Sequence, residues 1–94
     1  MDAKIKDLKP HMENVTLVAL VVEKSDPTWM GFDKKRYASA IVEDETGRIK
    51  LNLWRDQVDQ VKKGDLVRIP GAFVHVRNGT LQISTWSSIQ LAGC

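Results

Sequence analysis

Cysteine and long apolar runs are both nearly missing from this sequence. Cys94, the last residue, is the only cysteine, so neither an internal disulfide nor a cysteine-based zinc site is possible. The apolar run from Val15 to Val22 is far too short to cross a bilayer, which takes about 20 residues. No basic-then-apolar leader precedes it. We therefore expect an intracellular protein with no membrane partner.

Residues suited to catalysis or metal binding are also scarce. The two histidines are His11 in the polar lead and His75 on a predicted strand face, and both are explained most simply as surface residues. The sequence has no nucleophile motif, no glycine-rich phosphate loop and no ligand set at metal spacing. The adjacent acids Asp44 and Glu45 are best explained as turn residues. We expect a protein that is not an enzyme and uses no cofactor or metal.

Charge of one sign is not in large excess, because the net charge is only +2. The position of the bases is more informative than their sum. Arg36 precedes Tyr37, and Lys50 and Arg55 lie on either side of Trp54. Cations beside aromatic rings suit a ligand that has both phosphates and flat bases. This placement is a first indication of a nucleic-acid partner.

The length of the chain fits a single domain over residues 1–94 with a modest core. Residues 1–12 form a polar lead, in which Ile5 and Leu8 are spaced to plug one end of that core. Residues 15–22 are rich in β-branched side chains and predict a long strand. Because both faces of this strand are apolar, we expect it to contribute to two sides of a closed sheet.

The next segment, residues 25–36, predicts a long loop that separates the first two strands. Asp26-Pro27 breaks the first strand, and the loop holds Trp29 and Phe32. Loops of this length in a small domain tend to be functional or mobile. The aromatic side chains of this loop are expected either to clamp a ligand or to tuck into the rim of the sheet.

Residues 37–43 and 48–54 predict a hairpin whose turn is Asp44-Glu45-Thr46-Gly47. The second of these strands alternates strictly, as a half-buried strand does. Its inward set is Ile49, Leu51 and Leu53, and its outward set is Lys50, Asn52 and Trp54. The core needs none of the outward side chains, so this face is the first candidate for a binding surface.

A short helix and two further strands follow. Asp56 is placed to cap a helix that buries Val58 and Val61. In residues 66–77 the inward set is Val67, Ile69, Ala72, Val74 and Val76, with a change of parity that predicts a bulge at Pro70-Gly71. Asn78-Gly79 predicts a tight hairpin, which leads into a fifth strand over residues 80–86.

Five strands with one short helix between the third and the fourth indicate an all-β fold. The pattern is typical of a five-stranded barrel of the OB type, and a closed barrel leaves no exposed sheet edges.

The large aromatic rings are the most informative residues of this pattern. By parity Trp54, Phe73 and Trp86 all lie outside the core, although big apolar rings are usually buried. One explanation is that they cover an end of the barrel. The other is that they stack unpaired bases, while basic and polar neighbours bind phosphates and base edges. The predicted DNA-binding residues are Trp54, Phe73, Trp86, Lys50, Asn52, Arg55, Arg77, His75, Gln82, Tyr37, Arg36 and Trp29.

Nearly the whole chain resembles a known family, the simple single-OB single-stranded DNA-binding proteins of archaea and their short eukaryotic relatives. The matching motifs are Ile5-Lys6-Asp7-Leu8-Lys9-Pro10, Ala40-Ile41-Val42-Glu43-Asp44-Glu45-Thr46-Gly47-Arg48-Ile49-Lys50-Leu51 with Leu53-Trp54, Val61-Lys62-Lys63-Gly64-Asp65, and Asn78-Gly79-Thr80-Leu81-Gln82-Ile83. The resemblance implies an OB barrel that coats single-stranded DNA in replication, recombination and repair without a cofactor. It also implies that Trp54 and Phe73 stack bases. Where archaeal relatives often have an aromatic residue, this chain has Arg77.

The resemblance also carries expectations about partners and location. We also expect a monomer in the cytoplasm, at the nucleoid of a prokaryotic cell. Many members recruit replication and repair proteins through an acidic C-terminal tail, and this sequence shows none. Two other functions fit the same residues: an RNA-binding OB domain, because stacking does not distinguish the sugars, and an OB subunit whose aromatic residues form a protein–protein interface.

Overall fold

Nine elements follow one another along residues 2–92, the part of the chain that the structure, a computed structural model, describes. They are η1 (Ile5–Asp7), β1 (Val15–Lys24), β2 (Thr28–Met30), β3 (Lys35–Asp44), β4 (Gly47–Trp54), α1 (Gln57–Gln60), β5 (Leu66–Arg77), β6 (Thr80–Thr85) and β7 (Gln90–Leu91). Cys94 lies outside these residues. Within them no helix is long and apolar enough to span a membrane.

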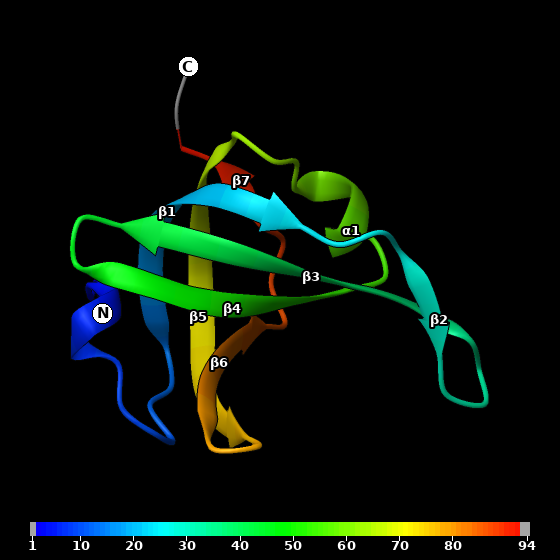
Figure 1. Ribbon diagram of the computed structural model, residues 1–94, viewed down its shortest axis with the longest axis horizontal. Helices are drawn as coiled ribbons and strands as arrows, with labels where there is room; N and C mark the ends of the chain where they lie inside the picture. Colours follow the sequence, from blue (N-terminus) through cyan, green and yellow to red (C-terminus); the bar gives the residue numbers. More distant parts are fainter. Residues whose placement is uncertain (1, 93–94) are drawn as a thin grey trace.

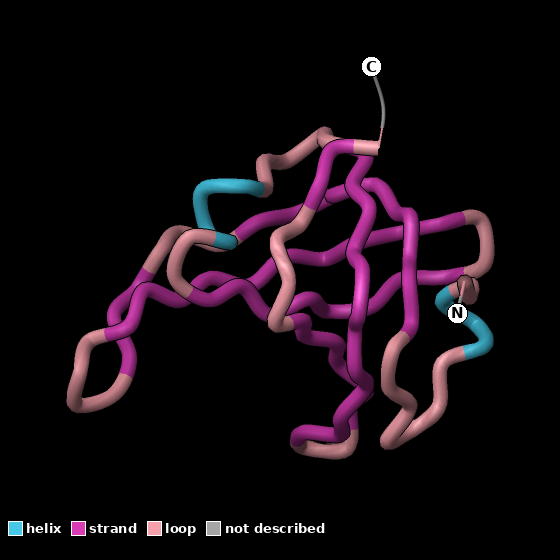
Figure 2. The backbone as a smooth tube through the Cα atoms, turned by 180° about the vertical axis from the view of Figure 1, so that it is seen from behind, coloured by secondary structure: helices cyan, strands magenta, loops and turns pink. Residues whose placement is uncertain are grey.

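The strands close into a ring, as Figures 1 and 2 show from opposite sides. Its order is β1-β3-β4-β6-β5, and β5 pairs again with β1. The β4–β6 pairing is parallel, and the other pairings around the ring are antiparallel. Strand β1 reaches both β3 and β5, so it does serve two sides of the sheet. The all-β fold of five ring strands is confirmed, with α1 between the third and the fourth of them.

The interior of the ring holds the aliphatic side chains that the alternation placed there. On β4, Leu51 and Leu53 are fully buried and Ile49 is 7% exposed. The lead closes one end of this core, because Ile5 and Leu8 are buried against it. The core is therefore built from aliphatic residues, and the large aromatic side chains lie outside it.

The register change in β5 occurs at Pro70-Gly71, as predicted. Leu17 pairs with Ile69 and Val15 with Ala72, so two steps along β1 face three steps along β5. Gly71 takes a positive φ of 60° at this bulge, which suits a residue without a side chain. The bulge lets both halves of β5 present aliphatic residues to the core.

Three details differ from the sequence prediction. The segment 25–36 is not only a loop, because β2 pairs with the start of β3 and forms an arm that projects from the ring (Figure 1). Val76 was predicted to face inward but is 48% exposed, since it lies near the hairpin end of β5. Asp56 makes no side-chain capping hydrogen bond and has helical backbone angles.

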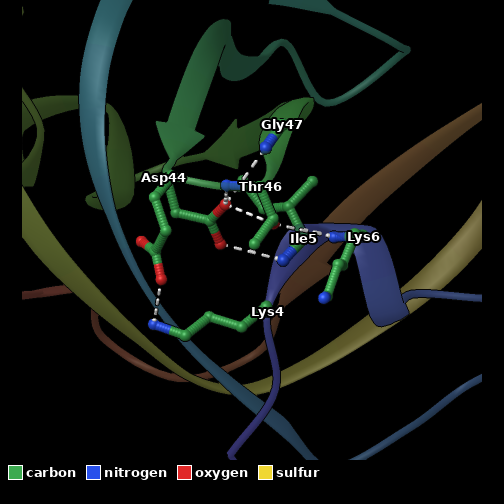
Figure 3. A network of polar contacts seen from close by, with 7 residues as sticks. Lys4, Ile5, Lys6, Asp44, Thr46 and Gly47 are labelled. Atoms are coloured by element: carbon green, nitrogen blue, oxygen red, sulfur yellow. Dashed lines mark hydrogen bonds and ion pairs between the residues drawn. The ribbon is translucent and has the colours of Figure 1, made fainter.

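The turn before β4 is tied to the lead (Figure 3). The Asp44 carboxylate accepts hydrogen bonds from the backbone N–H of Ile5 (2.9 Å), Thr46 (2.7 Å) and Gly47 (3.2 Å) and from the Thr46 hydroxyl. Lys6 N–H donates to Thr46 Oγ1 at 3.0 Å. Burial acts to raise the pKa of Asp44, but the hydrogen bonds from these groups hold that pKa below its usual value. Asp44 is thus a structural turn residue, as the sequence indicated.

Candidate nucleic-acid interface

The outer face of the sheet brings aromatic residues from distant parts of the chain together. Tyr37 lies opposite Trp54 across β3 and β4, and Phe73 lies opposite Ser84 across β5 and β6. Strand β6 pairs with β4, so the two hairpins share one continuous surface. Cross-strand partners project on the same side of a sheet. The parity that excluded these rings from the core therefore also places them on one face.

The rings on this face contact one another in two pairs. The Tyr37 and Trp54 centroids are 4.6 Å apart with planes tilted by 53°. Phe73 and Trp86 stack at 5.6 Å with planes 27° apart. Trp86 follows the end of β6 and is 89% exposed. This contact places Trp86 beside Phe73, as predicted, although Trp86 lies just past the end of β6, where alternation along the strand no longer applies.

Trp54, Phe73 and Trp86 line one groove of about 800 Å³, which we call the aromatic groove. Further residues in its lining are Lys35, Arg55, Asp56, Gln57, His75 and Ser84. A concave surface with flat rings, cations and hydrogen-bonding groups can stack planar ligands and bind their phosphates.

Asn52 and Gln82 lie on the predicted face but are not exposed. They are only 3% and 6% exposed, and Asn52 Nδ2 donates to Gln82 Oε1 at 3.0 Å. The Tyr37 hydroxyl donates to Asn52 Oδ1 at 2.5 Å. Both amides lie on the predicted outward face, but they satisfy each other below the surface and hold the Tyr37 hydroxyl. Their contact with base edges remains a prediction.

Tyr37 and His75 are both half-buried on this face. Burial raises the pKa of Tyr37, and the positive charge of Arg77 opposes that rise. His75 Nε2 is 3.0 Å from Ser84 Oγ, and its ring centroid is 5.9 Å from that of Phe73. His75 thus extends the row of flat side chains along β5.

The predicted cations are divided between two sides of the protein. Arg55 is exposed, follows Trp54 directly and lies 3.9 Å from Asp33. Lys50 is half-buried on the outer face of β4, where Gln82 is its partner on β6, and Arg77 is exposed at the end of β5. Arg55 lines the aromatic groove, whereas Lys50 and Arg77 lie on the same outer face of the sheet beyond its lining.

Arg36 and Trp29 are not brought into the aromatic groove. The Arg36 guanidinium makes a two-point ion pair with Asp59 of α1, at 2.7 and 2.9 Å. Trp29 is the cross-strand partner of Arg36 and is 66% exposed on the arm. Both therefore project on the side of β3 opposite to Tyr37, because neighbouring residues alternate along a strand. We do not include either residue in the proposed interface.

Sequence reasoning missed Gln57, which is buried in the wall of the aromatic groove. Its Oε1 accepts from the backbone N–H of Trp54 at 3.0 Å, and its Nε2 donates to the carbonyls of Thr85 and Ser87 at 2.7 and 2.9 Å. A polar residue just after a supposed helix cap carries no pattern that marks it as buried. Only the approach of β6 to the start of α1 gives it these partners.

The described residues offer no obvious metal centre, because no three histidine, cysteine or acidic side chains among them gather closely enough.

Comparison with known proteins agrees with this geometry. The family model described as "Single-stranded DNA binding protein Ssb-like, OB fold" matches residues 8–91. The chain belongs to this family. The sequence motifs resembled this same Ssb-like family. Its OB fold agrees with the closed sheet, and its single-stranded DNA-binding character agrees with the aromatic side chains on the outer face.

Two sequence relatives of this Ssb-like chain are archaeal. The single-stranded DNA-binding protein Ssb of Saccharolobus solfataricus is 34% identical over 94 residues, which cover 98% of this chain and 64% of that protein. Replication factor A of Methanothermobacter thermautotrophicus is 36% identical over 77 residues, which cover 76% of this chain and 9% of that protein. The chain thus spans less than two thirds of the length of either relative.

Solved structures show the same OB fold. The second OB-fold domain of replication protein A from Methanococcus maripaludis superposes with a TM-score of 0.83 at 28% identity, covering 100% of this chain and 97% of that domain. A crystal structure of a domain of that protein gives a TM-score of 0.80 at 31% identity, covering 98% of this chain and 96% of that one. Both share the OB fold of this chain over nearly its whole length.

Proposed function

We propose that this chain binds single-stranded DNA without strong sequence preference and protects it during replication, recombination and repair. The observation that carries the proposal is the aromatic groove, in which Trp54, Phe73 and Trp86 line one concave surface. Every base has a flat face, so stacking tolerates any sequence and contributes about 1–3 kcal/mol per base. The similarity to archaeal single-stranded DNA-binding proteins supports the same ligand.

Three cations of the outer face are proposed to bind the phosphates of the strand. Arg55 lines the groove, Lys50 and Arg77 lie on β4 and β5, and His75 extends the row of flat side chains beside Phe73. If each of these three cations displaces a counterion, a plot of the logarithm of the affinity against the logarithm of the salt concentration should have a slope of roughly −2. A slope this shallow would mean that stacking supplies most of the binding free energy.

The test of the proposal is titration of the protein with oligo-dT, followed by tryptophan fluorescence. Trp54 and Trp86 lie in the groove, so stacked bases should quench their emission, while Trp29 on the arm supplies a background. Trp54→Ala and Phe73→Ala should each weaken binding about 5- to 150-fold, the equivalent of one lost stack. Unchanged affinity in both variants would contradict the stacking mechanism.

A matched control removes an apolar side chain elsewhere. Leu20 on β1 is 39% exposed and does not line the groove, so Leu20→Ala should leave the affinity for oligo-dT within about twofold of the parent. Competition with oligo-U of the same length tests the sugar, since a 2′-OH contact would favour RNA. Tighter binding to oligo-U would show that the ligand is RNA and not single-stranded DNA.

We propose further that the chain acts as a monomer in the cytoplasm, at the nucleoid of a prokaryotic cell. Closure of the ring supports the monomer, because the five ring strands pair with one another and the remaining strands β2 and β7 have only 3 and 2 residues. A mass in sedimentation that does not change with protein concentration is the expected result. Binding to replication or repair proteins would be an additional role.

A further inference from the structure

Helix α1 is too short to be stable by itself, yet its side chains connect two distant segments. It has 4 residues, whereas isolated helices need about 12–15 residues even to be marginally stable. Gln57 and Gln60 are three residues apart and therefore lie on similar sides of the helix. Gln57 bonds the backbone of Trp54 and the carbonyls of Thr85 and Ser87, and Gln60 Oε1 accepts from Ile89 N–H at 2.8 Å. The two glutamines thus join the end of β4 to residues 85–89.

The segment that receives these bonds carries Trp86. It lies between the end of β6 and the start of β7, so residues 86–89 have no strand partners of their own. Thr85 connects this segment to β5 as well, because its hydroxyl donates to the Pro70 carbonyl and accepts from Ser87 N–H at 3.1 Å. The position of Trp86 over Phe73 therefore depends on side-chain hydrogen bonds to residues on both sides of it.

The chemistry of the site requires an amide at position 57. Trp54 N–H needs an acceptor, while the carbonyls of Thr85 and Ser87 need donors, and one glutamine side chain supplies both. A glutamate of the same length has no donor when it is ionised and would face two carbonyl oxygens. Gln57 is 9% exposed, so water does not readily replace a lost bond.

We propose that Gln57 is the positioning residue of the aromatic groove: it fixes the segment carrying Trp86 relative to Trp54 and so sets the distance between the two tryptophans. This inference rests on the proposed function, because the spacing of the rings matters for binding only if bases stack on them. Gln57 does not itself stack a base. It acts through the backbone on either side of Trp86 and through the backbone of Trp54.

Two substitutions test the role of the amide. Gln57→Leu keeps a side chain of similar volume without hydrogen bonds, and Gln57→Glu keeps the length but loses both donors. Each should weaken binding to oligo-dT on the order of tenfold, as expected when one or two buried hydrogen bonds are lost. Binding is measured well below the thermal midpoint of each variant. The matched control is Val58→Ala, which destabilises the same helix but leaves the Gln57 amide in place and should change the affinity by less than about twofold.

A double-mutant cycle separates positioning from a purely structural role. Trp86→Ala is measured in the parent and in the Gln57→Leu protein. If Gln57 holds Trp86 in place, then Trp86→Ala should weaken binding at least about fivefold in the parent and clearly less in the Gln57→Leu background. Equal losses in both backgrounds, or no loss in the parent, would overturn the proposal and leave Gln57 as a structural cross-link only.

The binding measurements on Trp54→Ala and Phe73→Ala distinguish failure of this proposal from failure of the proposed function. If Trp54→Ala and Phe73→Ala weaken binding but the cycle shows no coupling, the function stands and the role of Gln57 falls. If neither substitution weakens binding, stacking is wrong and the positioning role falls with it.

Discussion

Strand β4 begins at Gly47 and ends at Trp54, and polar side chains hold distant segments together at both ends. At the first end the Asp44 carboxylate bonds the lead through Ile5 N–H, and the Ile5 side chain is 7% exposed. At the second end the Gln57 amide bonds the backbone on both sides of Trp86, while the Trp86 ring is 89% exposed. One end closes the core and the other presents rings to solvent.

The difference shows that similar hydrogen bonding serves two purposes in one small fold. Near Gly47 the bonds and the apolar contacts reinforce each other, so the gain is in stability. Near Trp54 the bonds fix backbone positions while the rings remain free to meet a ligand, so the gain is in preorganised binding. Substitutions at the first end should therefore reduce stability and leave binding intact, and removal of the rings at the second end should mainly weaken binding.

The largest expected effect is on binding when two rings are removed at once. The double variant Trp54→Ala/Phe73→Ala should lose roughly 2–6 kcal/mol of binding free energy, since each stacked base contributes about 1–3 kcal/mol. Its urea midpoint should stay close to that of the parent, because both rings are only half-buried. Titration with oligo-dT and urea unfolding measure the two quantities. A large fall in stability with unchanged binding would remove the distinction between the two ends of β4.

The next largest effect concerns stability at the other end. Asp44→Ala removes the acceptor of four hydrogen bonds, so the free energy of unfolding should fall by about 1–3 kcal/mol. Asp44→Asn is the matched control, because it keeps one oxygen acceptor and should lose less. Oligo-dT affinity should be unchanged for both in conditions where they are folded. Weaker binding by folded Asp44→Ala would show that the lead contributes to the interface.

A smaller effect is expected from acid. Because the pKa of Asp44 lies below its usual value of 3.8 in the folded protein, its contribution to stability is fully present above that usual value. It is lost as the pH falls through 3.8 and then through the lower folded pKa. Urea unfolding of the parent and of Asp44→Asn across this range should show a pH-dependent difference that shrinks in acid. A constant difference would mean that the Asp44 charge does not contribute.

The smallest effect is expected at the surface ion pair between Lys4 and Glu45, which measures 2.7 Å. Both side chains are more than half exposed, so the hydrogen bond and the charge attraction are screened by water and salt. Lys4→Ala should change neither the urea midpoint nor the affinity for oligo-dT beyond experimental error. A clear loss of stability would show that the lead is held by this pair as well as by Asp44.

Most of the fold could be read from the sequence because burial and alternation are local properties. The inward positions of Leu51 and Leu53, the bulge at Pro70-Gly71 and the short helix between the third and fourth ring strands all follow from patterns within a few residues. The same patterns excluded Trp54, Phe73 and Trp86 from the core. The prediction of an OB fold needed only these patterns and the order of the elements.

The sequence could not show the contacts that depend on segments far apart in the chain. Alternation placed Asn52 on the outer face correctly, but its burial depends on Gln82, which is 30 residues away. Arg36 has the charge of a phosphate ligand, yet Asp59 of α1 engages it 23 residues further on. The arm at residues 25–36 gains a strand because residues 28–30 meet the start of β3.

The sequence by itself therefore determined most of the residues that face the core, the order of the five ring strands along the chain and the kind of side chains available for binding. Only the tertiary structure decided which of those side chains meet in the aromatic groove and that Gln57 links both tryptophans. The physical reason is that alternation fixes the side of a strand on which a residue lies. Closure of the ring and the contacts of α1 fix which distant residues become its neighbours.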